Sequence, residues 1–287
     1  MYNDSFRIRY KRAPVAISEN SSGADTAAHI HAEIEILYIV SGRWQVTVSD
    51  RRYDAAEGDM IIVNPFDVHS LRRVSDNPAR TLCICIDPCL LIDRELSDML
   101  RRGERSAGEY FAANDQITPL IYGYFQRIYS AVENDSETLC LESGAYLSLI
   151  FSELARGGAL ITRSQRGKRE SFSAKIQEYL ADHYSESITS DDAAEALFYS
   201  QSYFCRLFKK QFGTSFLEYL SMYRISRAKT MLETTHQRVA EVAEAVGFMD
   251  NAYFSRCFKR LVGFSPSEYK KINTVNEKSQ YSPNLVD

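Results

Sequence analysis

The spacing of hydrophobic residues changes along the chain, and each spacing predicts a different kind of structure. Up to about Pro88, short apolar runs alternate with polar residues and are broken by turn residues. These runs lie at 34–40, 44–48, 60–63 and 81–86. Alternation over short runs predicts half-buried strands, and several such strands in succession are typical of a β-sandwich or small barrel.

Beyond Pro88 the apolar residues recur with helical spacing. The segments that show it are 92–101, 116–133, 137–156 and 171–271. The stretch 157–169 begins with two glycines and continues with basic and polar residues, which predicts an interdomain linker. The tail 273–287 is polar and has no periodicity, so we expect it to be disordered.

Composition is that of a soluble protein with two domains. The chain has 287 residues, of which 45% are hydrophobic and 25% charged. No apolar run approaches the roughly 20 residues that cross a bilayer. The N-terminal segment lacks the apolar stretch of a signal peptide. We therefore expect a cytoplasmic protein.

Six cysteines are scattered through apolar segments. They are Cys83, Cys85, Cys89, Cys140, Cys205 and Cys257. In a reducing compartment the simplest expectation is that they are buried thiols. The spacing of the first three, Cys-x-Cys-x3-Cys, is not that of a zinc site.

The net charge of −4 argues against a nucleic-acid partner when it is taken alone. From residue 168 to residue 272 there are 15 basic and 13 acidic residues, against 19 and 25 in the remainder. Positive charge is thus weakly concentrated towards the C-terminus. The position of the basic residues, not their sum, must decide whether this part binds DNA.

An internal repeat is the strongest feature of the last hundred residues. The segment Tyr203–Tyr219 recurs 50 residues later as Tyr253–Tyr269, with the same Tyr, Phe, Arg, Lys, Gly, Ser and Glu at matching places. Upstream, 194–197 matches 243–246 at an offset of 49, so the second copy has a longer turn. Two copies are too few for a solenoid and predict two similar helical units.

Each unit contains the parts of a helix-turn-helix. Short helices are expected at 191–197 and 239–246, and second helices at 201–212 and 251–262. Ser200 and Asp250 are the expected N-caps of the second helices. Gly247 suits the positive φ of the second unit's turn, whereas the first unit has Phe198 at that place. We expect a cost in free energy there if the turn is unchanged.

The outward faces of the two second helices carry the candidate DNA-binding residues, opposite stripes of phenylalanine. In the first unit they are Gln201, Ser202, Cys205, Arg206, Lys209 and Lys210, and in the second Asn251, Ala252, Ser255, Arg256, Lys259 and Arg260. Arginine can make a two-pronged contact to guanine, and the lysines are better suited to phosphate. One such face alone would more simply be a solvated surface, but the arrangement occurs twice.

A family resemblance rests on three motifs of this part of the chain. They are Phe208–Leu220, Tyr223–Lys229 and Val242–Phe248 with its continuation to Tyr269. Through them residues 171–272 resemble the DNA-binding domain of bacterial AraC/XylS-type regulators. The resemblance implies a linker helix at 216–233 that holds the two recognition helices about one DNA turn apart. It also implies a dimer contact from the helices between 92 and 156, and RNA polymerase as a partner if the protein activates transcription.

The N-terminal half contains two motifs that resemble those of cupins. The first reads Gly23-x5-His29-x-His31-x3-Glu35-x6-Gly42. The second reads Gly58-x5-Asn64-Pro-Phe-Asp-Val-His69, and Asn64, Phe66 and Arg73 stand where Pro, Gly and Asn are usual. The histidines and the glutamate are spaced to point into a small barrel.

Three imidazoles and a carboxylate suit a divalent transition metal, so His29, His31, Glu35 and His69 are candidate metal ligands. Two alternatives stay open: the same residues line a pocket for an effector, or they are purely structural. Arg9, Tyr38 and Trp44 are further candidates for contact with an effector, Trp44 by stacking on a sugar ring. No cofactor is required on this interpretation.

The sequence therefore predicts an α+β protein with four regions. They are a cupin-like effector-binding barrel (1–90), a helical dimerisation and linker segment (91–165), an all-α domain with two helix-turn-helix units (166–272) and a disordered tail (273–287). We expect a homodimeric regulator, an activator more than a repressor, that binds double-stranded DNA and responds to a small molecule such as a sugar. The alternatives are a metal-dependent cupin enzyme fused to a DNA-binding module, and a dimeric regulator whose barrel binds nothing.

Overall fold

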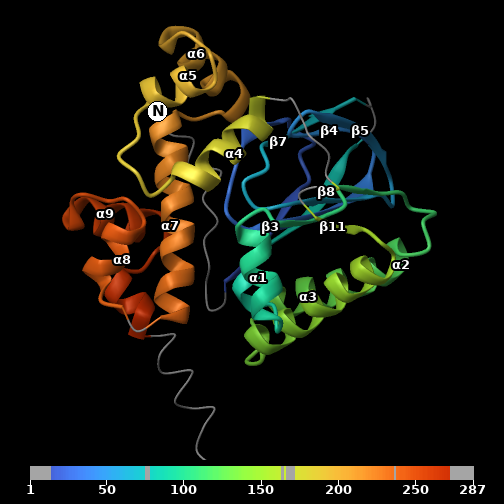
Figure 1. The fold of residues 1–287 in the computed structure, drawn as a ribbon. Helices are drawn as coiled ribbons and strands as arrows, with labels where there is room; N and C mark the ends of the chain where they lie inside the picture. Colours follow the sequence, from blue (N-terminus) through green and yellow to red (C-terminus); the bar gives the residue numbers. More distant parts are fainter. Residues whose placement is uncertain (1–13, 75–77, 163–164, 166–171, 236, 272–287) are drawn as a thin grey trace, which may run out of the picture.

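A computed structural model describes residues 14–74, 78–162, 165, 172–235 and 237–271. It shows a β-sandwich with helices on one face, followed by an all-helical domain (Figure 1). The tail at 273–287 and the candidate Arg9 lie outside these ranges, and so does the predicted linker from residue 163 on, apart from residue 165. The first part of that linker ends in a short strand at Leu160–Thr162. No helix among the described residues is long and apolar enough to cross a bilayer.

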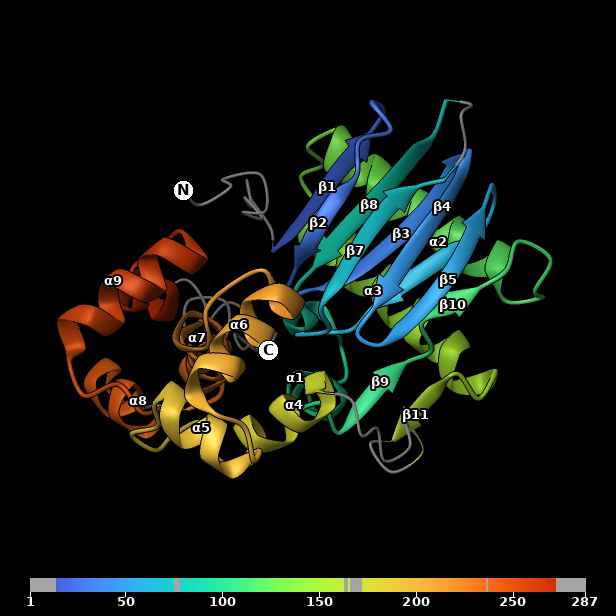
Figure 2. The ribbon, with the colours of Figure 1, turned by 90° about the horizontal axis from the view of Figure 1, so that it is seen from above.

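Two antiparallel sheets face each other in the N-terminal domain (Figure 2). The first has the strand order β1 (Val15–Asn20), β8 (Arg80–Ile86), β3 (Ile34–Ser41), β6 (Met60–Val63) and β10 (Tyr110–Phe111). The second has the order β2 (Thr26–His29), β7 (His69–Arg73), β4 (Arg43–Val48) and β5 (Arg51–Ala56). Alternate residues of each strand fill the space between the sheets, which is why these segments show a period of two.

The segment after the first eight strands is less purely helical than its spacing predicts. It contains the turn η2 (Pro88–Leu90) and the helices α1 (Arg94–Arg101), α2 (Thr118–Glu133) and α3 (Leu139–Arg156). It also contains β9 (Arg105–Ala107), β10 and β11 (Leu160–Thr162), which are too short to show a period. Because β10 pairs with β6, the first sheet continues beyond residue 90.

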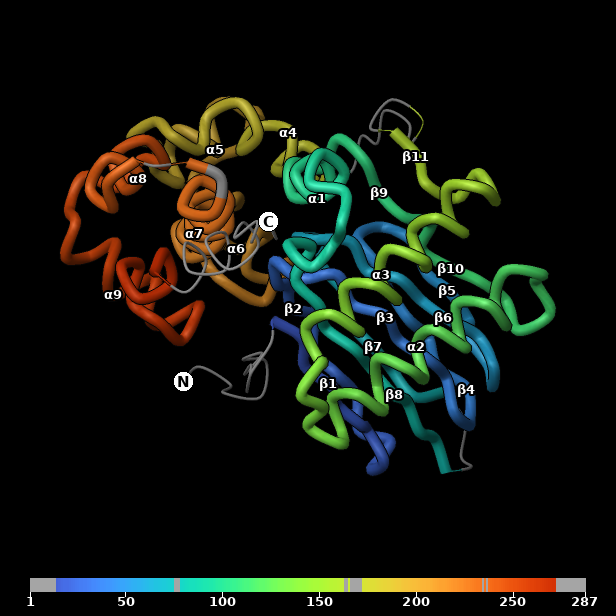
Figure 3. The backbone as a smooth tube through the Cα atoms, turned by 90° about the horizontal axis from the view of Figure 1, so that it is seen from below, coloured from blue at the N-terminus to red at the C-terminus, as the bar shows by residue number. Residues whose placement is uncertain are grey.

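Helices α2 and α3 lie across the outer face of the first sheet (Figure 3). Ile34, Ile36 and Ile84 point to these helices, whereas their strand neighbours Leu37 and Cys83 point into the sandwich. The first sheet is therefore buried on both faces. This explains the nearly continuous apolar runs of β3, β6 and β8.

The C-terminal domain is helical, without strands, in the residues described, 172–235 and 237–271. Its helices are α4 (Phe172–His183), α5 (Ser190–Ala196), α6 (Gln201–Phe212), α7 (Phe216–Thr234), α8 (Val239–Ala245) and α9 (Asn251–Val262). The bounds of α6 and α9 match the predicted second helices, and α5 and α8 lie within one residue of the predicted first helices. Helix α7 is the predicted linker helix, and the two units lie along it (Figure 1).

Candidate functional site: two reading helices and a polar sensor cluster

The two recognition helices bury their phenylalanines and expose their polar faces. Phe204 and Phe208 of α6, and Phe254 and Phe258 of α9, are fully buried. Of the predicted DNA-binding residues, Ser255 is half-buried and the other eleven are exposed. The expectation of buried thiols is wrong for Cys205, and also for Cys140 on α3, because both side chains are exposed.

Local hydrogen bonds and a ring contact orient some of the exposed side chains on the two recognition helices, α6 and α9, whose exposed polar sides form the reading face. The hydroxyl of Ser255 donates to the carbonyl of Asn251 at 2.9 Å, so it is turned back on its own helix. Arg256 lies over the ring of Tyr253, with its guanidinium carbon 5.9 Å from the ring centroid. Arg206 donates from Nε to the carbonyl of Ser202 at 3.2 Å. Both guanidinium groups keep free donors, as base contact requires.

The turns of the two units both contain a residue with a positive φ, although their sequences differ. Phe198 has φ 61° and Gly247 has φ 88°, so the phenylalanine adopts the left-handed conformation expected of glycine. Asp250 caps α9 by accepting from the amides of Ala252 and Tyr253. Ser200 is the N-cap of α6, but its side chain makes no capping hydrogen bond.

Helix α7 sets the distance between the reading helices. Its 19 residues give a length of about 28 Å at 1.5 Å per residue. One turn of DNA is about 34 Å long. The length of α7 is thus comparable to one turn of DNA.

A polar cluster lies inside the sandwich, at the end that faces the helical domain. His29 and His69 are cross-strand partners on β2 and β7, with ring centroids 4.1 Å apart. Glu35 on β3 faces them from the other sheet. Its Oε2 lies 3.0 Å from Nε2 of His31 and 3.2 Å from Nε2 of His69. The ligand atoms of all four residues lie within 4.8 Å of one another, so the fold brings together the predicted metal ligands.

The outward nitrogens of the three imidazoles all face backbone carbonyls. Nδ1 lies 3.0 Å from the carbonyl of Ala27 in His29, 3.2 Å from that of Glu33 in His31, and 3.0 Å from that of Asp67 in His69. A carbonyl can only accept, so Nδ1 carries a proton and the neutral ring presents a bare Nε2.

In His31 and His69 this bare Nε2 meets Oε2 of Glu35, which is also an acceptor. A cation is therefore required between them, either an additional proton on a ring or a metal ion. The donor set fits a divalent transition metal.

Burial and mutual repulsion govern the charges in this cluster. Burial, with His69 and His31 nearby, lowers the pKa of His29 to about 3, so this ring is neutral. Burial alone would lower the pKa of His31, but the hydrogen bond and charge of Glu35 raise it. Burial would raise the pKa of Glu35, yet His69 and His31 hold it well below its usual range. Glu35 is thus ionised, and its negative charge is stabilised by positive charge close to its oxygens.

Two thiols approach the same carboxylate from the neighbouring strand. Cys85 on β8 is the cross-strand partner of Glu35, and Cys83 is the partner of Leu37. The Sγ atom of Cys85 lies 3.7 Å from Oε2 of Glu35 and 3.6 Å from the Sγ of Cys83. The hydrogen bond to Cys83 and burial raise the pKa of the Cys85 thiol well above its usual range.

Tyr38 and Trp44 do not line an effector site inside the barrel. Tyr38 projects from the opposite face of β3 to Glu35 and stacks on Tyr122 of α2, with ring centroids 4.2 Å apart. Trp44 is fully buried among the apolar side chains between the sheets, so neither face of its ring can receive a sugar. The middle of this small sandwich is filled with side chains.

The loop that leads into β7 and His69 contacts helices α4 and α7, which pack against the first helix-turn-helix unit. The carbonyl of Phe66 accepts from the hydroxyl of Tyr219 on α7 at 3.2 Å and from the amide of Gln177 on α4 at 3.1 Å. The ring of Phe66 packs on Tyr223, with centroids 5.1 Å apart. Phe66 has φ 63°, so the substitution of the usual glycine keeps the backbone of the motif and adds an interdomain side chain.

A buried ion cluster forms a second interdomain contact. Asp87, next to β8, pairs with Arg101 of α1 at 2.6 Å and with Lys229 of α7. Arg101 also pairs with Glu233 of α7 at 3.1 Å. Burial would raise the pKa of Asp87, but Lys229 and Arg101 hold it far below its usual range. Nothing in the local sequence around these residues indicates the pairing.

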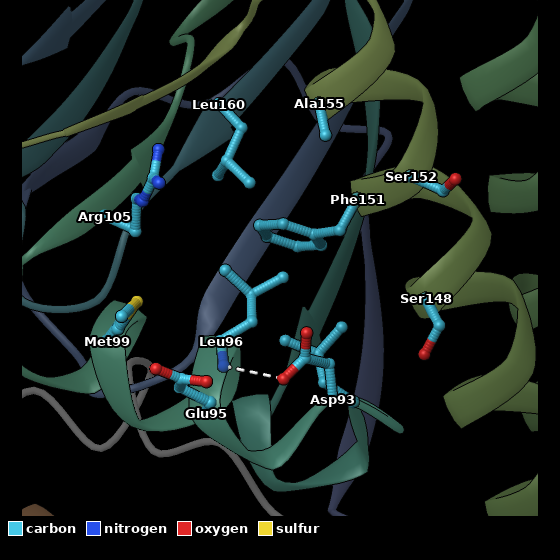
Figure 4. A pocket seen from close by; sticks show the side chains of 11 residues that line it. Asp93, Glu95, Leu96, Met99, Arg105, Ser148, Phe151, Ser152, Ala155 and Leu160 are labelled. Atoms are coloured by element: carbon cyan, nitrogen blue, oxygen red, sulfur yellow. Dashed lines mark hydrogen bonds between the residues drawn. The ribbon is translucent and has the colours of Figure 1, made fainter.

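A cavity of about 660 Å³ lies between α1, α3 and the β9–β11 ribbon (Figure 4). Leu96 and Phe151 form apolar walls, and Glu95, Arg105 and Ser152 supply polar groups. Sequence reasoning missed this site because its walls come from four elements, two of which are strands of three residues.

Comparison with known proteins assigns both halves of the chain. Residues 13–149 match the AraC-like ligand binding domain, and residues 193–272 match a helix-turn-helix domain. The chain belongs to the AraC family of transcriptional regulators. The family consists of DNA-binding regulators and not of enzymes, which decides against the fused-enzyme alternative.

Several relatives of this AraC-family regulator are bacterial. It is 24% identical over 263 residues to the HTH-type transcriptional regulator YdeC of Bacillus subtilis, and this alignment covers 90% of each chain. It is 33% identical over 165 residues to the arabinose operon regulatory protein of Salmonella typhimurium, which covers 56% of this chain and 57% of the relative. Among solved structures, ToxT of Vibrio cholerae is 16% identical with a TM-score of 0.39, covering 89% of this chain and 94% of ToxT.

Proposed function

We propose that this AraC-family regulator is a carbohydrate-responsive activator, and that the effector binds in the cavity beside α1. The observation that carries the proposal is the double role of α1. One face of this helix, with Glu95 and Leu96, lines the cavity, and its last residue, Arg101, binds α7. A ligand that shifts α1 therefore acts on the helix that spaces the two reading helices.

The chemistry of the cavity supports a sugar. A carboxylate, a guanidinium group and a serine hydroxyl can bind ring hydroxyls, while Phe151 offers an apolar surface. A volume of 660 Å³ suits a small ligand, since such sites measure about 300–1,000 Å³. The relationship to an arabinose operon regulatory protein points to the same class of effector.

The proposal is tested by thermal unfolding of the full-length protein with a panel of sugars. At a concentration of about 100 times Kd, a true effector stabilises the fold by about 2.7 kcal/mol. Glu95→Gln and Arg105→Gln should abolish the shift, and Arg52→Gln, an exposed site on β5, should keep it. No shift with any sugar, or an unchanged shift in both cavity variants, would contradict the proposal. Absence of any ligand effect would favour a barrel that serves only for dimerisation.

DNA binding by the twelve residues on α6 and α9 is part of the same proposal. An operator selected from a random duplex pool allows the affinity to be measured with and without the effector. Activation, with RNA polymerase as the partner, rests on the family resemblance. Transcription in vitro from a promoter that carries the operator tests it, and repression by the liganded protein would contradict it.

A homodimer is proposed through α3. Leu141 and Leu149 on α3 are 73% and 40% exposed, and Ile92, whose backbone N–H donates to Ser148 of α3, is 75% exposed. Large apolar side chains exposed on and beside one helix favour a partner. Sedimentation of the Leu141→Glu variant should show a monomer where the wild type is a dimer, and a monomeric wild type would contradict the proposal.

A divalent transition metal on His29, His31, Glu35 and His69 is also proposed, because the bare Nε2 atoms and the carboxylate need a cation between them. The metal would fix β2 and β7 against β3 at the end of the sandwich that contacts the first helix-turn-helix unit. Elemental analysis of protein purified without chelator should find about one ion per chain, and metal-free protein would contradict it.

A further inference from the structure

Cys83 and Cys85 extend the polar cluster with sulfur. Both are on β8 with their side chains inside the sandwich, and Cys85 lies opposite Glu35 in the strand pairing. The two Sγ atoms and the carboxylate oxygen lie within 4.8 Å of one another. These three atoms come from adjacent strands of one sheet, so the backbone holds them in place without any loop.

We propose that Cys83, Cys85 and Glu35 form a site for a thiophilic divalent metal ion such as Zn²⁺. Two sulfurs and a carboxylate oxygen supply three of the four ligands of a tetrahedral centre. The imidazoles of His31 and His69 already contact the same Oε2 and are the nearest candidates for the fourth. Because the two sets share Glu35, this site is an alternative to the histidine–carboxylate site proposed above, and about one ion per chain is expected for either. Binding forms two metal–sulfur bonds and releases the two thiol protons to solvent.

Convergence on a single oxygen favours a metal site over ordinary buried thiols. Nε2 of His31, Nε2 of His69 and Sγ of Cys85 all lie within 3.7 Å of Oε2 of Glu35. Thiolate ligands select soft ions, and imidazole nitrogens and carboxylate oxygens are also ligands of zinc. A mixed sulfur, nitrogen and oxygen set therefore matches zinc better than magnesium or calcium.

A disulfide accounts less well for the pair. Residues two apart on a strand have Cα atoms about 6.6 Å apart. This is at the upper limit of about 6.8 Å for a disulfide, so the bond would distort β8. An ion bridges the two thiols without such a change.

The test uses the full-length protein, stripped with chelator under reducing conditions and titrated with Co²⁺ as a spectroscopic substitute for Zn²⁺. A sulfur-to-cobalt charge-transfer band in the near ultraviolet is expected. Cys85→Ser and Cys83→Ser should remove or halve the band and weaken binding at least about tenfold. Cys140→Ser, at an exposed cysteine of α3, is the matched control and should leave both unchanged.

Alkylation gives a second readout that needs no variant. With Zn²⁺ bound, Cys83 and Cys85 should resist iodoacetamide, while Cys140 and Cys205 react equally with and without the ion. Cobalt binding without a sulfur band would overturn the sulfur site and leave the histidine–carboxylate site standing. Loss of protection, or rapid formation of a Cys83–Cys85 disulfide in the presence of Zn²⁺, would also overturn it. A sugar response in the same preparation is measured separately, so its failure would concern the proposed effector alone.

Discussion

Single side chains on the reading helices determine which contacts to DNA are available. Arg206 and Arg256 are exposed, occupy matching places in the repeat and keep free guanidinium donors. Lys210 lies further along α6 and suits phosphate. The two kinds of contact differ in what a substitution should do, because base contacts specify a sequence and phosphate contacts do not.

Arg256→Ala and Arg206→Ala should each cost about 1–3 kcal/mol of operator binding and relax the preference at one base position. Lys210→Ala should weaken all duplexes alike and reduce the salt dependence of log K by about one unit. Gel shifts at several salt concentrations check both. If both arginine variants keep the affinity of the wild type, the assignment of the reading face is wrong.

Phe198 is strained and gains nothing from packing. It has φ 61° and is 95% exposed. The left-handed conformation costs a residue with a Cβ about 1–2 kcal/mol, and glycine loses about 0.5–1 kcal/mol through its flexibility in the unfolded chain. Phe198→Gly should therefore raise the free energy of unfolding by about 0.5–1 kcal/mol in denaturant titrations. Phe198→Ala keeps the backbone strain, so its free energy of unfolding should not rise. An equal rise in both variants would show that the exposed ring, and not the backbone conformation, destabilises the fold.

At the scale of elements, the end of α6 meets strand β2 of the sensor. Gly213 ends α6 with φ 70°, and a Cβ there would lie 2.1 Å from the carbonyl oxygen of Ala28. Gly263 ends α9 in the same conformation, with φ 92°, but a Cβ there meets no described residue within 4 Å. The repeat thus supplies a matched pair of sites that differ in the interdomain contact.

Gly213→Ala and Gly263→Ala should each lower the free energy of unfolding by about 1–2 kcal/mol because of backbone strain. Only Gly213→Ala should also push the first helix-turn-helix unit off β2, because of the clash with Ala28. Hydrogen exchange of the backbone at 26–31 and 213–219 should rise in that variant alone. Equal exchange in the two variants would contradict the packing of α6 against the sensor.

At the scale of the whole molecule, the Asp87 cluster joins the sensor to α7. Removing one partner of a buried ion cluster costs about 3–5 kcal/mol, because the remaining charges stay buried. Asp87→Asn leaves Arg101 and Lys229 without their shared carboxylate. We expect a loss of this size in the free energy of unfolding at neutral pH.

The pH dependence of this loss has a defined sign. The pKa of Asp87 is held below 3.8, its ordinary value, in the folded protein. Its stabilisation is therefore fully present above about pH 3.8 and is lost as the pH falls towards the folded pKa. The difference between wild type and Asp87→Asn should be constant from pH 5 to 8 and shrink below pH 3.8, since other carboxylates titrate in both proteins. A constant difference through the acid range would contradict this role.

Local sequence determined the elements of this protein and the identity of its family. Helical and strand periods are properties of neighbouring residues, so α6, α7 and α9, the main strands and the repeated reading face were predictable. The spacing of His29, His31 and Glu35 indicated a shared polar cluster because strand residues alternate between faces. His29 and Glu35 lie on β2 and β3, whereas His31 lies in the connection between these strands.

Only the tertiary structure decided what surrounds these elements. The pairing of Glu35 with Cys85, the opposite orientation of Tyr38, the core position of Trp44 and the cavity beside α1 depend on strand order and sheet packing. The contacts of Phe66 and Asp87 with α7 join residues more than 140 positions apart. Contacts between distant segments follow from the whole fold, which is why no local pattern in the chain predicts them.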